Sequence, residues 1–226
     1  QEIIIKRGVA KEKVFLAPNS GDTNFSKKFN LVNSFNKDKT IFRFGYIGSF
    51  QFYEGLDDLI KAFDLLDKSK YKQRIELLLV GDGPYMDEIK QCAENSKYKQ
   101  TIILTGRVDR LKVIEYYKLI DVCIYPRKSN IVTEAVSPVK PLESMAIGIP
   151  IITSSVNPLK EICEFERGIV FKKDNINDLV KKLEYSIVNH EKLKINADNA
   201  KEWIKKNRNW AKITEVISNE LHTLIK

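Results

Sequence analysis

Short apolar runs alternate with amphipathic segments along most of this chain. The runs are rich in β-branched and aromatic residues and are bounded by Gly, Pro or Asp, as buried strands are. Because helical patterns separate the runs, the order predicts an α/β fold with a doubly wound, Rossmann-like parallel sheet, whose ligands bind at the carboxyl ends of the strands. The predicted strands are residues 42–47, 75–80, 101–104, 122–125, 149–153 and 168–171.

Three of the intervening segments carry apolar residues at helical spacing. The first covers residues 56–66, and the second follows Asp109, which we expect to cap it. The third covers residues 176–188, with Asn175 near its start. A helix between strands is the usual way in which a chain returns to begin the next parallel strand.

Sequence texture divides the chain into three parts. Residues 1–40 are polar and rich in turn formers, and we expect an entry helix followed by a linker segment. Residues 41–189 hold all the predicted strands and form the principal domain. Residues 190–226 carry two further helical patterns with no strand between them, and we expect Trp203 and Trp210 to pack on the flank of the sheet.

Composition narrows the range of partners. The chain has 226 residues and is 43% hydrophobic, which is enough for one large domain with a full core. Its net charge of +8 indicates a lysine-rich surface or an anionic partner, such as a nucleotide diphosphate, an anionic lipid or nucleic acid. No window reaches the roughly 20 apolar residues that span a bilayer, and we recognise no signal peptide. Cys92, Cys123 and Cys163 lack C-x-x-C spacing, which favours a reducing cytoplasm over a disulfide or zinc site.

The segment SPVKPLESMAIGIP at 137–150 is the most informative for chemistry. Pro141 is typical of the first turn of a helix, where free amide N–H groups can bind phosphate. Lys140 adds a cation beside those amides, and Glu143 adds a carboxylate suited to sugar hydroxyls. Together these groups predict a nucleotide-sugar site at the edge of an α/β sheet.

Six segments in one order resemble the C-terminal donor-binding domain of retaining GT-B glycosyltransferases of family 4, the glycosyl transferases group 1. Each segment alone is a common pattern, but the ordered set is specific and covers most of the chain. The segments are APNSGD at 17–22, FGYIGSFQFYEGLDDLI at 44–60, LLVGDGP at 78–84, TGRV at 105–108, DVCIYP at 121–126 and the segment at 137–150.

The resemblance implies a function for each part of the chain. Residues 41–189 would bind a nucleotide-diphosphate sugar of UDP or GDP type for retaining transfer to a glycan or lipid-linked acceptor, with no cofactor and no metal. An N-terminal domain, absent from this chain, would bind the acceptor, and residues 190–226 would pack on the donor domain or on that absent domain. The chain would then be a fragment of a cytoplasmic enzyme, for which peripheral contact with an anionic inner membrane face stays open.

The resemblance also implies site residues. Arg127 and Lys140 would be catalytic, because they would stabilise the charge of the leaving diphosphate, and Glu134 would stand in for the first glutamate of the donor motif. Glu143 would accept hydrogen bonds from ribose, and the backbone of Val108 would meet the base. The full donor-binding set is Gly48, Ser49, Arg107, Val108, Lys128, Val139, Pro141, Leu142 and Glu143. For Arg107, Arg127 and Lys128, a plain solvated charge remains the alternative.

Three positions depart from the common pattern of the family. Counting back from Glu143, the first glutamate position holds Ala135, and Glu134 lies one residue earlier. Ser49 and Glu54 stand where many members carry Arg and Lys. We therefore expect Arg127 and Lys140 to carry the phosphate charge, and Glu54 to point away from it or to bind a hydroxyl.

Other functions remain open at this point. The same departures suit a catalytically inactive module that binds a nucleotide sugar or a partner protein. A nucleotide-sugar epimerase of the GT-B fold would need acid–base side chains, of which this half has few. Dinucleotide binding is disfavoured because Pro84 follows the glycines at 81–83, where a helix should begin. Nucleic-acid binding is disfavoured because the basic residues are dispersed.

Overall fold

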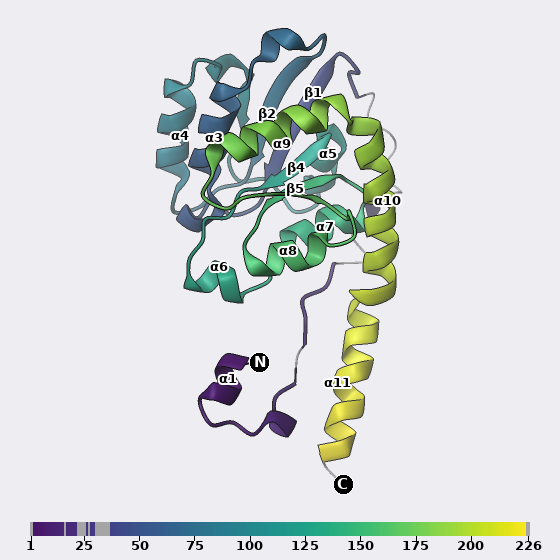
Figure 1. Cartoon of the computed structure of the whole chain (residues 1–226). Helices are drawn as coiled ribbons and strands as arrows, with labels where there is room; N and C mark the ends of the chain where they lie inside the picture. Colours follow the sequence, from purple (N-terminus) through teal and green to yellow (C-terminus); the bar gives the residue numbers. More distant parts are fainter. Residues whose placement is uncertain (1, 16, 22–25, 27, 30–36, 225–226) are drawn as a thin grey trace.

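The structure is a computed structural model that describes residues 2–15, 17–21, 26, 28–29 and 37–224 (Figure 1). Its centre is a six-stranded sheet of order β3-β2-β1-β4-β5-β6, in which every pairing is parallel. The predicted doubly wound α/β fold is therefore confirmed. The strands are β1 (Ile41–Ile47), β2 (Arg74–Val80), β3 (Ile102–Leu104), β4 (Val122–Tyr125), β5 (Ile151–Ser154) and β6 (Ile169–Phe171).

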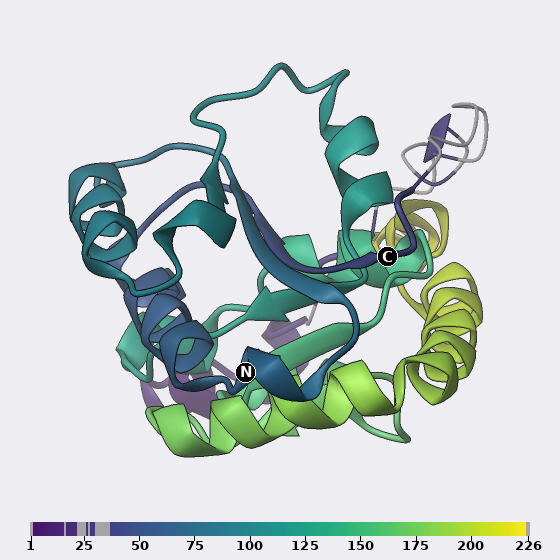
Figure 2. The ribbon, with the colours of Figure 1, turned by 90° about the horizontal axis from the view of Figure 1, so that it is seen from above.

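Helices cover both faces of the sheet, as the view from above shows (Figure 2). Helix α3 packs against α4 and α9, and α10 packs along α7. The α-helices are α1 (Glu2–Lys6), α3 (Leu56–Leu65), α4 (Met86–Asn95), α5 (Val113–Leu119), α6 (Ile131–Ala135), α7 (Lys140–Ala146), α8 (Asn157–Cys163), α9 (Ile176–Val188), α10 (His190–Asn207) and α11 (Trp210–Leu224). Short 3₁₀ helices are η1 (Lys11–Lys13), η2 (Phe52–Glu54), η3 (Lys68–Lys70) and η4 (Lys99–Thr101).

The strand order reverses between β1 and β4, which lie side by side at the middle of the sheet. In doubly wound sheets, the crevice outside the carboxyl ends of these two strands is where ligands bind. Phe42, Phe44 and Tyr46 alternate along β1 and are buried, since both faces of a parallel sheet are covered by helices. The core therefore holds the loops that follow β1 and β4 in fixed positions.

Two predicted boundaries are wrong. Asp109 does not cap a helix, because its carboxylate accepts a hydrogen bond from the Leu111 amide in a turn, and α5 begins only at Val113. The fifth strand begins at Ile151 rather than two residues earlier, because the Ile149 amide donates to the last turn of α7. Asn175, which lies near the start of the third predicted helix, caps α9, since its side chain accepts from the Asp178 amide.

The chain ends fit the predicted helical texture where they are described. Glu2–Lys6 is helical, whereas Gln1, Asp22 and most of 24–36 lie outside the described residues. Helices α10 and α11 follow one another with no strand between them, and α11 extends below the sheet (Figure 1). Trp203 packs on the core beside Arg167, but Trp210 is 49% exposed, so the expectation that both pack on the sheet is wrong for Trp210.

Candidate functional site

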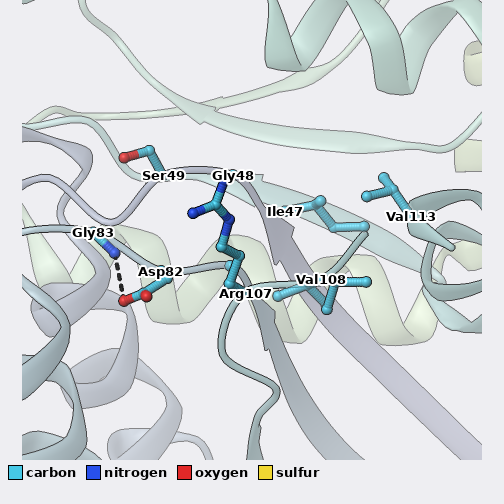
Figure 3. Close-up of a pocket in the computed structure, with 10 residues that line it drawn as sticks. Ile47, Gly48, Ser49, Asp82, Gly83, Arg107, Val108 and Val113 are labelled. Carbon is cyan, nitrogen blue, oxygen red and sulfur yellow. Dashed lines mark hydrogen bonds between the residues drawn. The ribbon is translucent and has the colours of Figure 1, made fainter. Parts of the chain in front are cut away.

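A cavity of about 490 Å³ opens at the carboxyl ends of β1 and β2 (Figure 3). The Arg107 side chain, from the loop after β3, extends into it (Figure 3). Four predicted donor-binding residues line the cavity, which agrees with their placement on loops that follow strands. The lining residues are Ile47, Gly48, Ser49, Val80, Gly81, Asp82, Gly83, Arg107, Val108 and Val113.

Close backbone contacts hold these loops together. The Gly48 amide donates to the Val80 carbonyl at 2.9 Å, and the Gly81 amide donates to the Gly106 carbonyl at 3.1 Å. Gly81 has φ +136°, and a Cβ there would lie only 1.9 Å from the Gly48 carbonyl oxygen. The floor of the cavity is thus a stack of main chain that requires glycine at this position.

Lys140, the first residue of α7, contacts Gly48 of the cavity lining. Its Nζ donates to the Tyr46 hydroxyl at 2.5 Å, to the Ser49 carbonyl at 3.3 Å and to Glu54 Oε1 at 3.1 Å. A Cβ on Gly48 would lie 2.8 Å from this Nζ, so the ammonium lies directly over a residue of the cavity lining. Burial lowers the pKa of Lys140, and the charge of Glu54 works in the opposite direction.

Arg127 comes to the same carboxylate from the end of β4. Its Nε lies 3.6 Å from Glu54 Oε2, and one terminal nitrogen donates to the Val136 carbonyl at 3.1 Å. Arg127 and Glu54 are only 5% and 4% exposed. Glu54 therefore faces both predicted cations, and the expectation that it points away from a bound diphosphate or binds a hydroxyl stays a prediction. Two buried cations without a counter-ion would be costly, which explains the carboxylate between them.

The remaining charged candidates are paired elsewhere. Lys128 forms an ion pair with Asp57 at 2.7 Å. Glu134 accepts from Ser129 Oγ at 2.7 Å, from the Asn157 amide at 3.0 Å and from Lys173 at 2.5 Å. These contacts tie α6 to the start of α8, and neither residue lines the cavity.

The α7 candidates stand beside the cavity rather than in its lining. Val139 is 38% exposed, Pro141 and Leu142 are buried, and Glu143 is half-buried. The helix has only seven residues, so its dipole is small and Lys140 supplies most of the positive charge here. Sequence reasoning missed six lining residues, of which the ends of predicted strands pointed to the first two: Ile47, Val80, Gly81, Asp82, Gly83 and Val113.

The residues of this site belong to a recognisable family. The model of the family described as Glycosyl transferases group 1 matches residues 27–209 of this chain. The chain belongs to the group 1 glycosyltransferases. It is 29% identical over 211 residues to an uncharacterized glycosyltransferase of Methanocaldococcus jannaschii, covering 92% of this chain and 49% of that protein. It is 26% identical over 149 residues to an alpha-monoglucosyldiacylglycerol synthase of Streptococcus pneumoniae, covering 66% of this chain and 31% of that protein.

Structural comparison agrees with the family. HepE of Anabaena, solved in complex with UDP and glucose, superposes with a TM-score of 0.75 at 17% identity, over 98% of this chain and 60% of that one. The fold of this group 1 glycosyltransferase is therefore that of GT-B enzymes. The chain spans about half the length, or less, of the curated relatives that it matches.

A second cavity of about 610 Å³ lies at the amino end of β1, where Lys37, Asp121 and His190 meet. It is larger than the first, but Lys37 is paired with Asp121 and Lys194 with Glu191, and parallel sheets bind ligands at the other end. Among the described residues, no cluster of His, Cys, Asp and Glu is arranged to hold a metal ion. No described helix combines the length and apolarity needed to cross a bilayer.

The contacts of Glu134 predict a pH-dependent contribution to stability. Hydrogen bonds from Lys173, Ser129 and the Asn157 amide lower the pKa of Glu134 from 4.5 to about 2. We expect Glu134→Gln to destabilise the fold by about 1 kcal/mol at pH 7, because the site is partly screened by solvent. Since the folded pKa is depressed, this difference should be lost as pH falls from about 4.5 through about 2. Urea unfolding of both proteins at pH 7 and pH 3 measures it, and an equal deficit at both values would contradict this account.

Proposed function

We propose that this chain is the donor-binding half of a retaining glycosyltransferase of family 4, which uses a nucleotide-diphosphate sugar of UDP or GDP type. The observation that carries the proposal is the Lys140 ammonium placed over Gly48, at the edge of the cavity that Arg107 and Val108 line. The cavity has room for a base and ribose. The Lys140 ammonium lies beside Gly48 of its lining, which supports contact with the diphosphate attached to that ribose. HepE, which shares the fold, was solved with UDP.

In this proposal the reaction breaks the bond between the sugar C1 and the diphosphate oxygen. The bond's electron pair leaves on the diphosphate, the acceptor hydroxyl oxygen bonds to C1, and its proton is released. Fixed cations that stabilise charge as it develops are a strong source of catalysis. Lys140 provides this cation, Arg107 contacts the nucleotide, and Glu143 is placed to meet the ribose. No metal is needed in this scheme.

The acceptor would be a glycan or a lipid-linked molecule bound by an N-terminal half. The name of the Streptococcus pneumoniae relative specifies a glycolipid product, which supports a lipid-linked acceptor at a membrane face. The net charge of +8 is compatible with peripheral contact of a cytoplasmic enzyme with an anionic membrane. The chain alone should therefore bind donor without transferring sugar.

Glu54 supports a second candidate, a module that binds nucleotide sugar without catalysis. Its carboxylate offsets part of the charge of Lys140 and Arg127. The two candidates differ in the whole protein. Sugar transfer by a protein that includes the acceptor-binding half would exclude the inactive module.

Isothermal titration calorimetry of the chain with UDP, GDP, uridine and guanosine tests the proposal. We expect one diphosphate to bind more tightly than its nucleoside, because the phosphates contact Lys140. Absence of binding by both diphosphates at millimolar concentration would refute the proposal.

A further inference from the structure

The ion pairs around Glu54 join three loops of the donor site. Glu54 ends η2 after β1, Arg127 follows β4, and Lys140 begins α7. Each carboxylate oxygen of Glu54 faces a different cation, Lys140 at 3.1 Å and Arg127 at 3.6 Å. The Glu54 side chain is only 5% exposed, so water screens these contacts poorly.

The Glu54 carboxylate faces cations rather than the cavity. Glu54 does not line the cavity, and both of its oxygens are directed at cations that come from other segments. Lys140 has a long, flexible side chain that loses several rotamers when it is fixed over Gly48. In the part of the chain that the structure describes, the Tyr46 hydroxyl and the Ser49 carbonyl also accept from this ammonium, and both are neutral.

We propose that Glu54 is a positioning residue that holds the Lys140 ammonium, charged and oriented, at the phosphate-binding edge of the donor cavity, with Arg127 anchoring the other carboxylate oxygen. This inference rests on the proposed function for its ligand, a nucleoside diphosphate. Glu54 stands at a position where many members of the resembling family carry lysine. In this chain the acidic residue instead fixes Lys140, a lysine supplied from α7.

The charged state of Lys140 depends on all the groups that face it. Burial lowers the pKa of Lys140, Glu54 and Glu143 raise it, and Arg127 lowers it. Tyr46 does not titrate in the working range, because burial raises its pKa well above 10. Removing the Glu54 charge therefore leaves burial and Arg127 to favour the neutral amine, and the pKa of Lys140 falls further.

The test compares the chain with Glu54→Gln, which keeps the side-chain shape and removes the charge. UDP and GDP binding is measured by calorimetry from pH 7 to pH 9, above the pKa of about 6 of a terminal phosphate. We expect the affinity of Glu54→Gln to fall more steeply toward pH 9 than that of the wild type, by up to about tenfold, because loss of the Glu54 charge lowers the pKa of Lys140 further. Asp87→Asn is the matched control, because it removes the same charge from a residue of α4 whose side chain is 94% exposed.

A second readout needs no ligand. Lysine side-chain NMR of the labelled chain, assigned with Lys140→Arg, gives the pKa of Lys140 directly in the wild type, in Glu54→Gln and in Glu54→Asp. We expect Glu54→Gln to lower this pKa and Glu54→Asp, which keeps the charge, to restore most of it. Circular dichroism confirms that each variant is folded.

The outcomes separate the inference from the function on which it rests. Diphosphate binding with the same pH profile and Lys140 pKa in Glu54→Gln as in the wild type would overturn the positioning role and leave the proposed function standing. Absence of diphosphate binding by the wild type would refute the proposed function and, with it, the ligand assigned here, whatever the NMR shows. A lowered Lys140 pKa together with the shifted binding profile supports the inference.

Discussion

Lys140→Ala should weaken binding of the cognate nucleoside diphosphate by about 10- to 100-fold, because a charge-assisted contact is worth about 1.5–3 kcal/mol. Binding of the corresponding nucleoside should change little, since in the proposed binding mode the base and ribose contact the other end of the cavity. The variant also leaves Glu54 close to the phosphates, where its charge would repel them. Calorimetry with UDP and uridine, or with GDP and guanosine, measures both effects.

Lys160→Ala is the matched control, because it removes the same charge from an exposed position on α8. It should bind diphosphate as the wild type does. Equal losses of nucleoside and diphosphate affinity in Lys140→Ala would mean that this lysine does not contact phosphate.

Gly81→Ala should destabilise the fold by roughly 2–6 kcal/mol, which sums backbone strain and steric overlap. The residue has φ +136°, and the added Cβ would lie 1.9 Å from the Gly48 carbonyl oxygen, which is main chain and cannot rotate away. The loop after β1 must therefore move. Because Gly48 and Ser49 of this loop line the cavity, the movement distorts the cavity. We expect a lower midpoint of chemical unfolding and loss of nucleotide binding even in the folded fraction.

Gly106→Ala separates strain from overlap. Gly106 also has a positive φ, +68°, but a Cβ there would meet nothing within 4 Å. It should cost only the strain of about 1 kcal/mol and retain the cavity. A Gly81→Ala variant as stable as Gly106→Ala would show that the loops are less tightly packed than the structure indicates.

Much of the fold could be predicted because local and global signals agree. The run at 122–125 is apolar on both faces, and the run at 42–47 is apolar or aromatic except for Arg43 and Gly45; in a chain that alternates with helices, this leaves few options besides central parallel strands. The observed strands β1 and β4 match them within a residue. Helix α9 was predicted with its bounds from amphipathic periodicity, and the structure adds that Asn175, just before it, is its cap.

The short helices could not be predicted in the same way. Helices α6 and α8 have five and seven residues, too few to show a helical period, and contacts with each other and with β5 stabilise them. The ion pair between Glu54 and Lys140 could not be predicted from the sequence either. Glu54 and Lys140 lie far apart in sequence, and only the closure of the sheet between β1 and β4 brings them within 3.1 Å.

Part of the predicted donor-binding set lies together in the structure, although the roles of these residues stay predictions. Gly48, Ser49, Arg107 and Val108 line the cavity because they follow strands, and strand ends were visible in the sequence. Glu134 was expected to stand in for a missing glutamate, and its ion pair with Lys173 depends on α8 and β6, whose arrangement no local pattern encodes. Its catalytic role stays a prediction.

The central claim is that the Lys140 ammonium binds the diphosphate of the donor at the edge of the cavity between β1 and β2. A crystal structure of the chain soaked with UDP or GDP tests it most directly. We predict phosphate oxygens within hydrogen-bonding distance of Lys140 Nζ, with the base beside Val108. A nucleotide bound with its phosphates away from Lys140, or at the amino end of the sheet beside Lys37 and His190, would contradict the claim.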